Sequence, residues 1–388
     1  MDNLNICIPK ERIRRNVAAI FLISALCFSS WTSRISYIQE NLNLDDGRFG
    51  LLLFCLPFGV LLSLPISSNL TRKFGSKPVL IFGIIGLMIT LIMLSFVKNL
   101  YITGFCLILF GFSNNATNLT ANLQAAQTER LFGKSIMGSF HGIWSVSALL
   151  GSLFGSLCMS KHIPMSTQFF VITVVAAIVL FTSYRNLINE NRTDEQSTIF
   201  AFKIKNKSVL ILGLIALCAM IGEGSMYDWS EIYLKRTVQS NHFMSSLGYS
   251  TFMFAMMTGR FGSDLSVRKF GLHTTLTFAG LLSVLGFLIC AISELYVIIL
   301  LGYFFIGLGT SAVVPVVYGT LAKIGRDKLN QYITTISSIS FLGLLFAPPF
   351  IGIIAQNFSI RTAFVCLLII SSLIILLSKR LRSDRSGI

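Results

Sequence analysis

Long apolar runs recur along the chain and are separated by short polar segments. Each run is close to the roughly 20 apolar residues that a helix needs to cross a bilayer. The longest polar interruption, 184–207, follows the sixth run. The pattern predicts an all-α membrane protein with twelve transmembrane helices, six before and six after this linker. The predicted spans are 16–38, 47–70, 78–97, 100–125, 135–158, 166–183, 208–232, 244–266, 273–293, 295–321, 330–355 and 360–378.

Composition supports an integral membrane protein. Of the 388 residues 54% are hydrophobic and only 12% are charged, whereas soluble proteins carry about 25% charged residues. The eight cysteines are scattered without a CxxC spacing, so neither a metal site nor a disulfide framework is indicated. The first run is flanked by basic residues but lacks a small-residue cleavage site, which indicates a first span and not a signal peptide. We expect a monomer in the lipid bilayer, with no cofactor and no metal.

The basic residues predict the orientation. With the N-terminus inside, the cytoplasmic segments hold 23 Lys and Arg and the opposite side holds 6. Basic residues favour cytoplasmic loops, so both termini and the linker are expected in the cytoplasm of a multi-pass inner-membrane protein. This bias also accounts for the net charge of +15, so no nucleic-acid partner is expected.

The two halves share an internal repeat. Arg72-Lys73-Phe74-Gly75 recurs 196 residues later as Arg268-Lys269-Phe270-Gly271, and Gly111 and Gly307 have the same offset. Trp31 and Trp229 are 198 residues apart. Several matches at nearly half the chain length indicate duplication. We therefore expect two pseudo-symmetric six-helix bundles, 1–183 and 208–388, joined by the cytoplasmic linker 184–207.

Acidic residues interrupt the seventh apolar run. Glu223 lies roughly 22 Å along the predicted helix, at a rise of about 1.5 Å per residue. An acid within a bilayer costs about 2–3 kcal/mol and normally faces a protein interior or a water-filled cavity. The alternative is that Glu223, Asp228 and Glu231 mark only the wet outer end of the helix. The functional interpretation is that this helix lines a polar path, with Tyr227 and Trp229 beside the acids.

The fourth run is the most polar one. Asn114, Asn118 and Asn122 are spaced i, i+4 and i+8 and therefore share one helical face, with Asn115 beside it. These amides either hold helices together, at about 0.6 kcal/mol each, or line a solute path. His141 begins the next span and is either a buried proton shuttle or a hydrogen-bonded core residue.

Further charged and small residues fall inside other spans. Arg260 and Asp264 are one turn apart, a spacing that lets them neutralise each other. Arg34 lies near the end of the first span, three residues after Trp31. A contact between Arg34 and Glu223 or Asp228 is one possibility. Small residues around Thr310, with Pro315 nearby, are typical of a helix that bends during transport.

The basic loops resemble a cytoplasmic motif of the major facilitator superfamily, Gly-x-x-x-Asp-Arg-x-Gly-Arg-Lys. Aligned on Gly75, this chain has Ser68 in place of the first Gly and Arg72 in place of the Asp. The resemblance implies gating roles, and ordinary cytoplasmic basic loops are the alternative. The residues concerned are Arg72, Lys73, Gly75, Arg260, Asp264, Arg268 and Gly271.

Across its whole length the chain resembles the branch of that superfamily that includes the bacterial permeases YbjJ and MosC. The resemblance is carried by Ser30-Trp31-Thr32-Ser33-Arg34, Arg72-Lys73-Phe74-Gly75, Asn118 to Asn122 with Glu129-Arg130, His141-Gly142, Glu223 to Trp229, Gly259-Arg260-Phe261 and Gly307-Leu308-Gly309. It implies a proton-linked carrier for a small polar solute of the sugar or cyclitol class. The branch usually has an acid at the position of Asn118. If that acid takes up the proton in the relatives, this protein either uses Glu223 or another group or transports without coupling.

Together these features lead to one hypothesis, a secondary active transporter that works by alternating access. A proton-driven efflux pump for amphipathic compounds is the alternative, and the sequence contains no constellation typical of an enzyme. Glu223, Asp228 and His141 are the candidates for proton coupling. The expected solute-binding residues are Trp31, Arg34, Asn114, Asn115, Asn118, Asn122, His141, Glu223, Tyr227, Asp228, Trp229 and Thr310.

Overall fold

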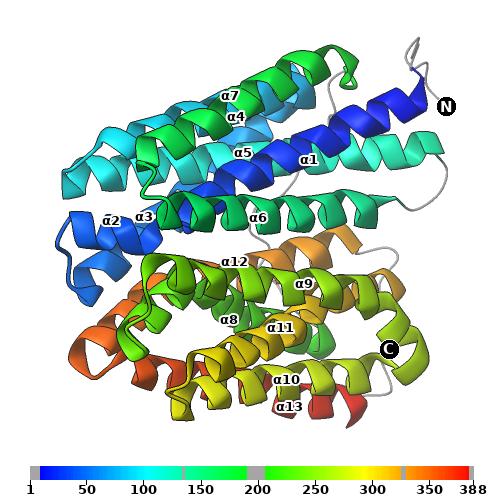
Figure 1. Cartoon of the computed structure of the whole chain (residues 1–388). Coiled ribbons are helices and arrows are strands. Elements are labelled where there is room, and N and C mark those ends of the chain that lie inside the picture. Colours follow the sequence, from blue (N-terminus) through cyan, green and yellow to red (C-terminus); the bar gives the residue numbers. More distant parts are fainter. Residues whose placement is uncertain (1–8, 133–135, 190–205, 325–328, 384–388) are drawn as a thin grey trace. The chain divides into compact units, whose positions relative to one another are not determined.

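The chain folds into helices joined by short connections (Figure 1). The computed structural model describes residues 9–132, 136–189, 206–324 and 329–383, and all regular structure in these ranges is helical. The all-α prediction is therefore confirmed. The helices are α1 (Lys10–Thr32), α2 (Ile35–Asn41), α3 (Asp46–Phe74), α4 (Ser76–Phe96), α5 (Leu100–Phe132), α6 (Met137–Ser160), α7 (Met165–Ser183), the 3₁₀ turn η1 (Tyr184–Asn186), α8 (Lys207–Thr237), α9 (His242–Phe270), α10 (Leu272–Ile292), α11 (Tyr296–Ile324), α12 (Leu329–Asn357) and α13 (Ile360–Ser383).

Most of these helices are suited to a membrane. Among the described residues, eleven segments are long and apolar enough to span a bilayer, with α1 and α2 counted as one segment. They fall at every predicted span except 244–266. There the chain forms α9, a helix of 29 residues whose hydropathy is lowered by several Ser residues and by Arg260. A helix thus occupies each of the twelve predicted places.

The first predicted span is divided in two. The sequence predicts one helix over 16–38, but α1 ends at Thr32 and α2 begins at Ile35. Several hydroxyl residues precede the break, and Ser30 Oγ donates to the Leu26 carbonyl at 2.7 Å. Serine and threonine hydroxyls that bond to preceding carbonyls weaken and bend helices. Arg34 occupies the joint, with φ −119° and ψ 8°.

By its internal contacts the chain divides into two compact units. The first comprises Met1–Trp31, Cys55–Phe154 and His162–Ser197, and the second comprises Thr32–Phe54, Gly155–Lys161 and Thr198–Ile388. In the first unit α4 packs against α5 and α7. In the second, α8 packs against α9, α11, α12 and α13, and α2 also contacts it. Much of the expected linker 184–207 lies outside the described residues, so the division into 1–183 and 208–388 stays a prediction.

The internal repeat extends to helix packing. A Cβ added to Gly111 of α5 would collide with the Leu56 carbonyl of α3, and one added to Gly307 of α11 would lie 2.5 Å from the Phe252 carbonyl of α9. Gly307 lies 196 positions after Gly111, and Phe252 lies 196 positions after Leu56, so the two contacts are equivalent. Each half therefore uses one glycine to bring the same pair of helices close together.

The basic loops repeat in geometry as well. Gly75 and Gly271 have φ of 86° and 79°, a region that residues with a side chain rarely adopt. Lys73 lies over Phe74 with Nζ 5.2 Å from the ring centroid, and Lys269 lies over Phe270 at 5.3 Å. These glycines end one helix and begin the next, which explains why the Arg-Lys-Phe-Gly sequence recurs.

Candidate functional site

A buried carboxylate joins α8 to α9 in the second unit. Glu223 is 5% exposed, and its Oε1 accepts a hydrogen bond from Arg260 Nη2 at 3.2 Å. The same oxygen accepts a hydrogen bond from the Tyr227 hydroxyl, one turn further along α8. Glu223 therefore has a cation and a phenol as partners inside a membrane-spanning segment. We had expected Arg260 to pair with Asp264, whose side chain lies outside the described residues.

Aromatic rings surround this carboxylate. The Tyr227 ring lies edge-on to Tyr249 and Phe252, with centroids 6.0 and 5.9 Å away. Burial among apolar rings strengthens charge interactions, because little water is present to screen them. The pair of Glu223 and Arg260 is therefore an ion pair whose carboxylate is buried.

Asp228 lies on the same helix in a different setting. It is half-buried, and no described residue forms a hydrogen bond or ion pair with it. Its neighbour Trp229 is fully buried and lies edge-on to Phe49, with centroids 6.0 Å apart. The Trp229 indole N–H also lacks an acceptor among the described residues. Asp228 is thus the acid of α8 that is open to a further partner.

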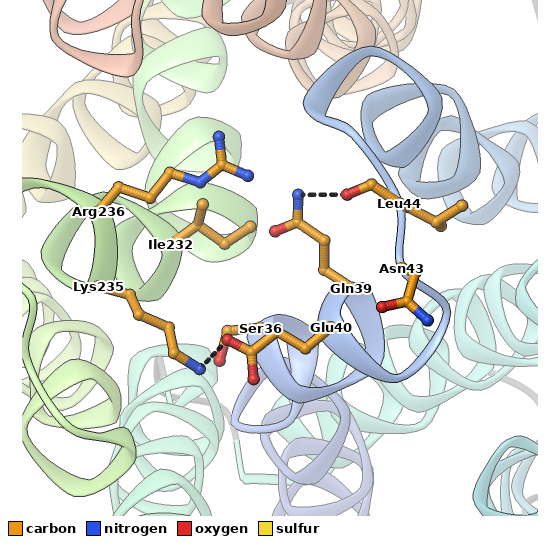
Figure 2. Close-up of a pocket in the computed structure, with 8 residues that line it drawn as sticks. All are labelled: Ser36, Gln39, Glu40, Asn43, Leu44, Ile232, Lys235 and Arg236. Atoms are coloured by element: carbon orange, nitrogen blue, oxygen red, sulfur yellow. Dashed lines mark hydrogen bonds and ion pairs between the residues drawn. The ribbon is translucent and has the colours of Figure 1, made fainter.

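A polar cluster forms where α2 and the start of α3 meet the last turns of α8 (Figure 2). Lys235 forms an ion pair with Glu40, and Arg236 forms one with Asp46. Gln39 donates to Asp46 at 3.0 Å, and Ser36 donates to Glu231 at 2.6 Å. The cluster borders a pocket of about 250 Å³. We call it the Arg236 cluster: Ser36, Gln39, Glu40, Asp46, Glu231, Lys235 and Arg236.

The Arg236 cluster is extended on two sides. Gln356 of α12 accepts from the Asp46 backbone N–H at 3.1 Å, so α12 also holds the start of α3. Arg34 is 3% exposed, and its guanidinium carbon lies 5.7 Å from the centroid of the Tyr37 ring. Its positive charge also interacts with the Glu231 carboxylate. The sequence suggested Glu223 or Asp228 as the partner of Arg34. In the structure, Arg34 interacts with Glu231.

In the first unit, the predicted asparagine face lies on one continuous helix, α5. Asn114, Asn118 and Asn122 are each half-buried, so the spacing does place three amides on one face. The Asn115 amide nitrogen and the Asn122 amide oxygen are buried without a described hydrogen-bond partner. Gln124, by contrast, bonds to Ser76 and to both backbone groups of Ile188 and is structural.

Three other predicted residues lie in different surroundings. His141 is exposed on α6 and lies edge-on to Phe21, with centroids 5.6 Å apart, so the expected burial is not observed. Trp31 is fully buried, 6.4 Å from the Phe110 centroid. The Thr310 hydroxyl donates to the Ile306 carbonyl at 2.9 Å and is occupied by its own helix.

The gating residues predicted in the two basic loops lie at helix ends, whereas Arg260 lies inside α9. Arg72 donates to Asn69 at 3.2 Å and is exposed, as is Arg268. Among the described residues, no acidic side chain forms an ion pair with Arg72.

Most of the Arg236 cluster was not predicted from the sequence. Lys235 and Arg236 were used only to count charges, and Glu40 and Asp46 were not singled out. Two adjacent basic residues on the side where such residues are scarce were a usable signal. Their partners depend on the helix break at Arg34, which was not predicted.

Comparison with known proteins identifies the family. The profile of the Major Facilitator Superfamily matches residues 17–288 and 212–387. The uncharacterized transporter y4wD of Sinorhizobium fredii is 27% identical over 372 residues, covering 95% of this chain and 98% of that protein. The membrane protein MosC of Rhizobium meliloti is 26% identical and covers 96% and 90%. The multi-drug resistance efflux pump PmrA of Streptococcus pneumoniae is 25% identical and covers 77% of each.

Solved structures support the same fold. A crystal structure of a mutant of the nucleoside transporter NupG superposes with a TM-score of 0.79 at 13% identity, covering 95% of this chain and 99% of that one. The similarity to MosC expected from sequence is thus confirmed at the level of distant homology. The chain belongs to the major facilitator superfamily and is a multi-pass membrane protein, a secondary transporter and not an enzyme.

Proposed function

We propose that this transporter moves a small polar solute, of the sugar or cyclitol class, across the inner membrane by alternating access, coupled to protons. The observation that carries the proposal is the buried Glu223 carboxylate with Arg260 at 3.2 Å. An ionisable residue within a membrane span usually marks a substrate or proton pathway. The asparagine face of α5 supports a solute rich in hydroxyl groups, since amides both donate and accept hydrogen bonds.

Proton coupling follows from the partners of Glu223. When the carboxylate is ionised it accepts from Arg260 and Tyr227 and holds α9 to α8. When it is protonated, its attraction for the guanidinium is lost and Arg260 becomes available to another acceptor. A proton thereby biases the equilibrium between two arrangements of these helices, which is how a ligand drives a conformational change.

Asp228 supports a separate role in solute binding. It is half-buried and no described residue pairs with it. A carboxylate accepts hydrogen bonds from hydroxyl groups, and such bonds are stronger than those between neutral groups. Asp228 is therefore the acid that we assign to the solute, while Glu223 takes the proton.

The Arg236 cluster supports a gate. With both termini in the cytoplasm, as the basic loops favour, this cluster lies at the outer end of α8. Its ion pairs hold α2 and the start of α3 against α8, so they would have to separate when that end opens. Elements that exchange contacts between two discrete arrangements are the usual basis of alternating access.

The test is transport by purified protein in liposomes. A thermal-shift screen against sugars, cyclitols and nucleosides first selects a ligand, because binding to the folded state raises its melting temperature. Uptake or efflux is then measured with and without a pH gradient. We expect the gradient to stimulate the wild type and to have no effect on Glu223→Gln. The control is Glu294→Gln, whose side chain is 76% exposed and should behave as wild type. Equal transport by Glu223→Gln, with unchanged pH dependence, would remove the coupling role.

An efflux pump for amphipathic compounds is the second candidate. It is favoured by the similarity to PmrA, which is named as a multi-drug resistance efflux pump. Overexpression in a drug-sensitive strain separates the two functions. Raised resistance to several unrelated compounds, with no stabilisation by sugars or cyclitols, would replace our first proposal by this one.

A further inference from the structure

A groove runs between α9, α10 and α11, away from the residues discussed above. Its volume is about 500 Å³, within the range of ordinary ligand sites. Its lining includes Gly262, Ser266 and Phe270 of α9, Phe278 of α10 and Leu308 of α11. A Cβ added to Gly262 would meet no atom within 4 Å, so the space there is open.

The groove is apolar although hydroxyl residues line it. Ser263 donates to the Arg260 carbonyl at 2.8 Å, and Ser266 donates to the Gly262 carbonyl at 2.9 Å. Thr275 donates to the Gly271 carbonyl at 2.8 Å. Each of these hydroxyls donates its hydrogen to a backbone carbonyl three or four residues earlier in the chain. The groove therefore has few hydrogen-bond donors left for a ligand. It therefore suits a hydrocarbon chain better than a polar solute.

Large apolar side chains surround the groove on the exposed surface. Phe278 is 56% exposed, Phe261 66% and Leu265 61%. In a membrane protein, exposed apolar residues within a span face lipid. This exposure supports a groove that opens toward the hydrocarbon of the bilayer.

Positive charge lies at one end of the groove. Lys269 Nζ is 5.3 Å from the centroid of Phe270, which lines the groove, and Arg268 is exposed beside it. Neither cation forms an ion pair with a described side chain, and Asp264, one turn before Arg268, has a side chain that the structure does not describe. Basic residues next to a membrane attract anionic lipid head groups.

The internal repeat shows that three positions lining the groove differ between the halves. The positions of Gly262, Ser266 and Leu308 correspond, at the offset of 196, to Ile66, Leu70 and Phe112. All three first-half residues are larger, and Ile66 is 46% exposed. The Arg-Lys-Phe-Gly loop is the same in both halves. The first half thus has the same basic loop, with larger residues at these three positions.

We propose that this groove binds an anionic phospholipid, with one acyl chain between α9, α10 and α11 and the phosphate on Arg268 and Lys269. The phosphate accepts charge-assisted hydrogen bonds from the guanidinium and the ammonium. The acyl chain fills the space that Gly262 leaves. This site is separate from the transport site, and its test does not depend on the proposed solute.

Native mass spectrometry of the purified full-length protein tests the proposal. The protein, released from detergent, is titrated with dioleoyl phosphatidylglycerol or with dioleoyl phosphatidylcholine, which has the same chains and no net charge. We expect one phosphatidylglycerol to bind at least about tenfold more tightly than phosphatidylcholine, because each basic residue near a head group contributes about fivefold. Equal binding of the two lipids would overturn the proposal.

Three variants separate the chain from the head group. Gly262→Ile reproduces the first half and fills the groove, so it should remove the tight site while the protein keeps its melting temperature. Arg268→Gln with Lys269→Gln should remove the preference for phosphatidylglycerol. The matched control, Arg72→Gln with Lys73→Gln, changes the same charges in the first half and should leave the tight site intact. Retention of the site in Gly262→Ile, or an equal loss in the two double variants, would show binding by surface charge alone and overturn the proposal.

Discussion

Arg260 Nη2 lies 3.2 Å from Glu223 Oε1 and thereby connects α9 to α8 inside the membrane-spanning region. Their side chains are 27% and 6% exposed. A carboxylate that loses its cation in such a place is left with an uncompensated charge, which is costly. The two residues should therefore act as a unit in stability as well as in transport.

A double-mutant cycle measures this unit. Glu223→Gln and Arg260→Gln should each lower the free energy of unfolding, and the double variant should lose less than the sum of the two. We expect a coupling free energy of about 1–3 kcal/mol, as found for residues in one polar network. Thermal or denaturant unfolding in detergent provides the measurement.

The chain contains a matched control for this cycle. Arg361 and Glu294 are also 3.2 Å apart, but their side chains are 35% and 76% exposed. Solvent-exposed pairs contribute about 0–1 kcal/mol. A coupling between Glu223 and Arg260 no larger than that of the exposed pair would contradict the assignment of a buried functional unit.

The Arg236 cluster should control access to the end of α8. Arg236→Gln with Asp46→Asn removes one ion pair, and charged hydrogen bonds contribute about 1.5–3 kcal/mol. Cys158 is 1% exposed and lies near Arg34, beside the Arg236 cluster. The rate at which its thiol is labelled therefore measures how far this end opens. With the other seven of the eight cysteines replaced, an impermeant maleimide should label Cys158 at least about fivefold faster in the double variant.

Arg48→Gln is the control for the labelling experiment. It removes one positive charge from the same segment, but the Arg48 side chain is 73% exposed. Its labelling rate should match that of the parent protein. An unchanged rate in the Arg236 and Asp46 variant would mean that these ion pairs do not hold α2 and α3 in place.

The turn glycines should tolerate no side chain. Gly271 has φ of +79°, and a Cβ there would meet no atom within 4 Å, so only the backbone conformation opposes substitution. Gly271→Ala should cost about 1–3 kcal/mol of unfolding free energy. Gly319 of α11 has equally open space and lies within a helix, so Gly319→Ala should be neutral or stabilising. Equal melting temperatures for the two variants would contradict the conformational explanation.

The close contact of α9 with α11 makes a further prediction. A Cβ on Gly307 would lie 2.5 Å from the Phe252 carbonyl and 2.8 Å from the Ala255 Cβ. Gly307→Ala should therefore force the helices apart and cost about 1–3 kcal/mol, typical of overpacking. Gly262→Ala, where the space is open, should not destabilise the protein. Unfolding of both variants in the same detergent tests whether close packing or helix propensity dominates.

Much of the fold was predictable because long apolar runs leave few options in a bilayer. A helix satisfies all of its own backbone hydrogen bonds, so run length alone gave the positions of the spans. The repeated Arg-Lys-Phe-Gly loops were also informative, since Gly75 and Gly271 adopt the same rare conformation. The break at Arg34 was not predicted, because the hydroxyl residues before it can bend a helix without ending it.

Side-chain partners were less predictable than spans. Sequence spacing favoured Asp264 as the partner of Arg260, because local pairs follow directly from helix geometry. The contact with Glu223 depends instead on how α8 and α9 are rotated, which no local pattern specifies. The ion pair of Arg236 with Asp46 likewise joins residues that are 190 positions apart.

The break in the first span has a consequence for dissecting the protein. Trp31 belongs by its contacts to the first compact unit, while Thr32–Phe54 belongs to the second, together with Arg236 and Glu231. A fragment that starts at the linker would lack the segment that pairs with the end of α8. A separately expressed second half would therefore lack part of its own unit, and co-expression with the first half would have to supply the missing segments.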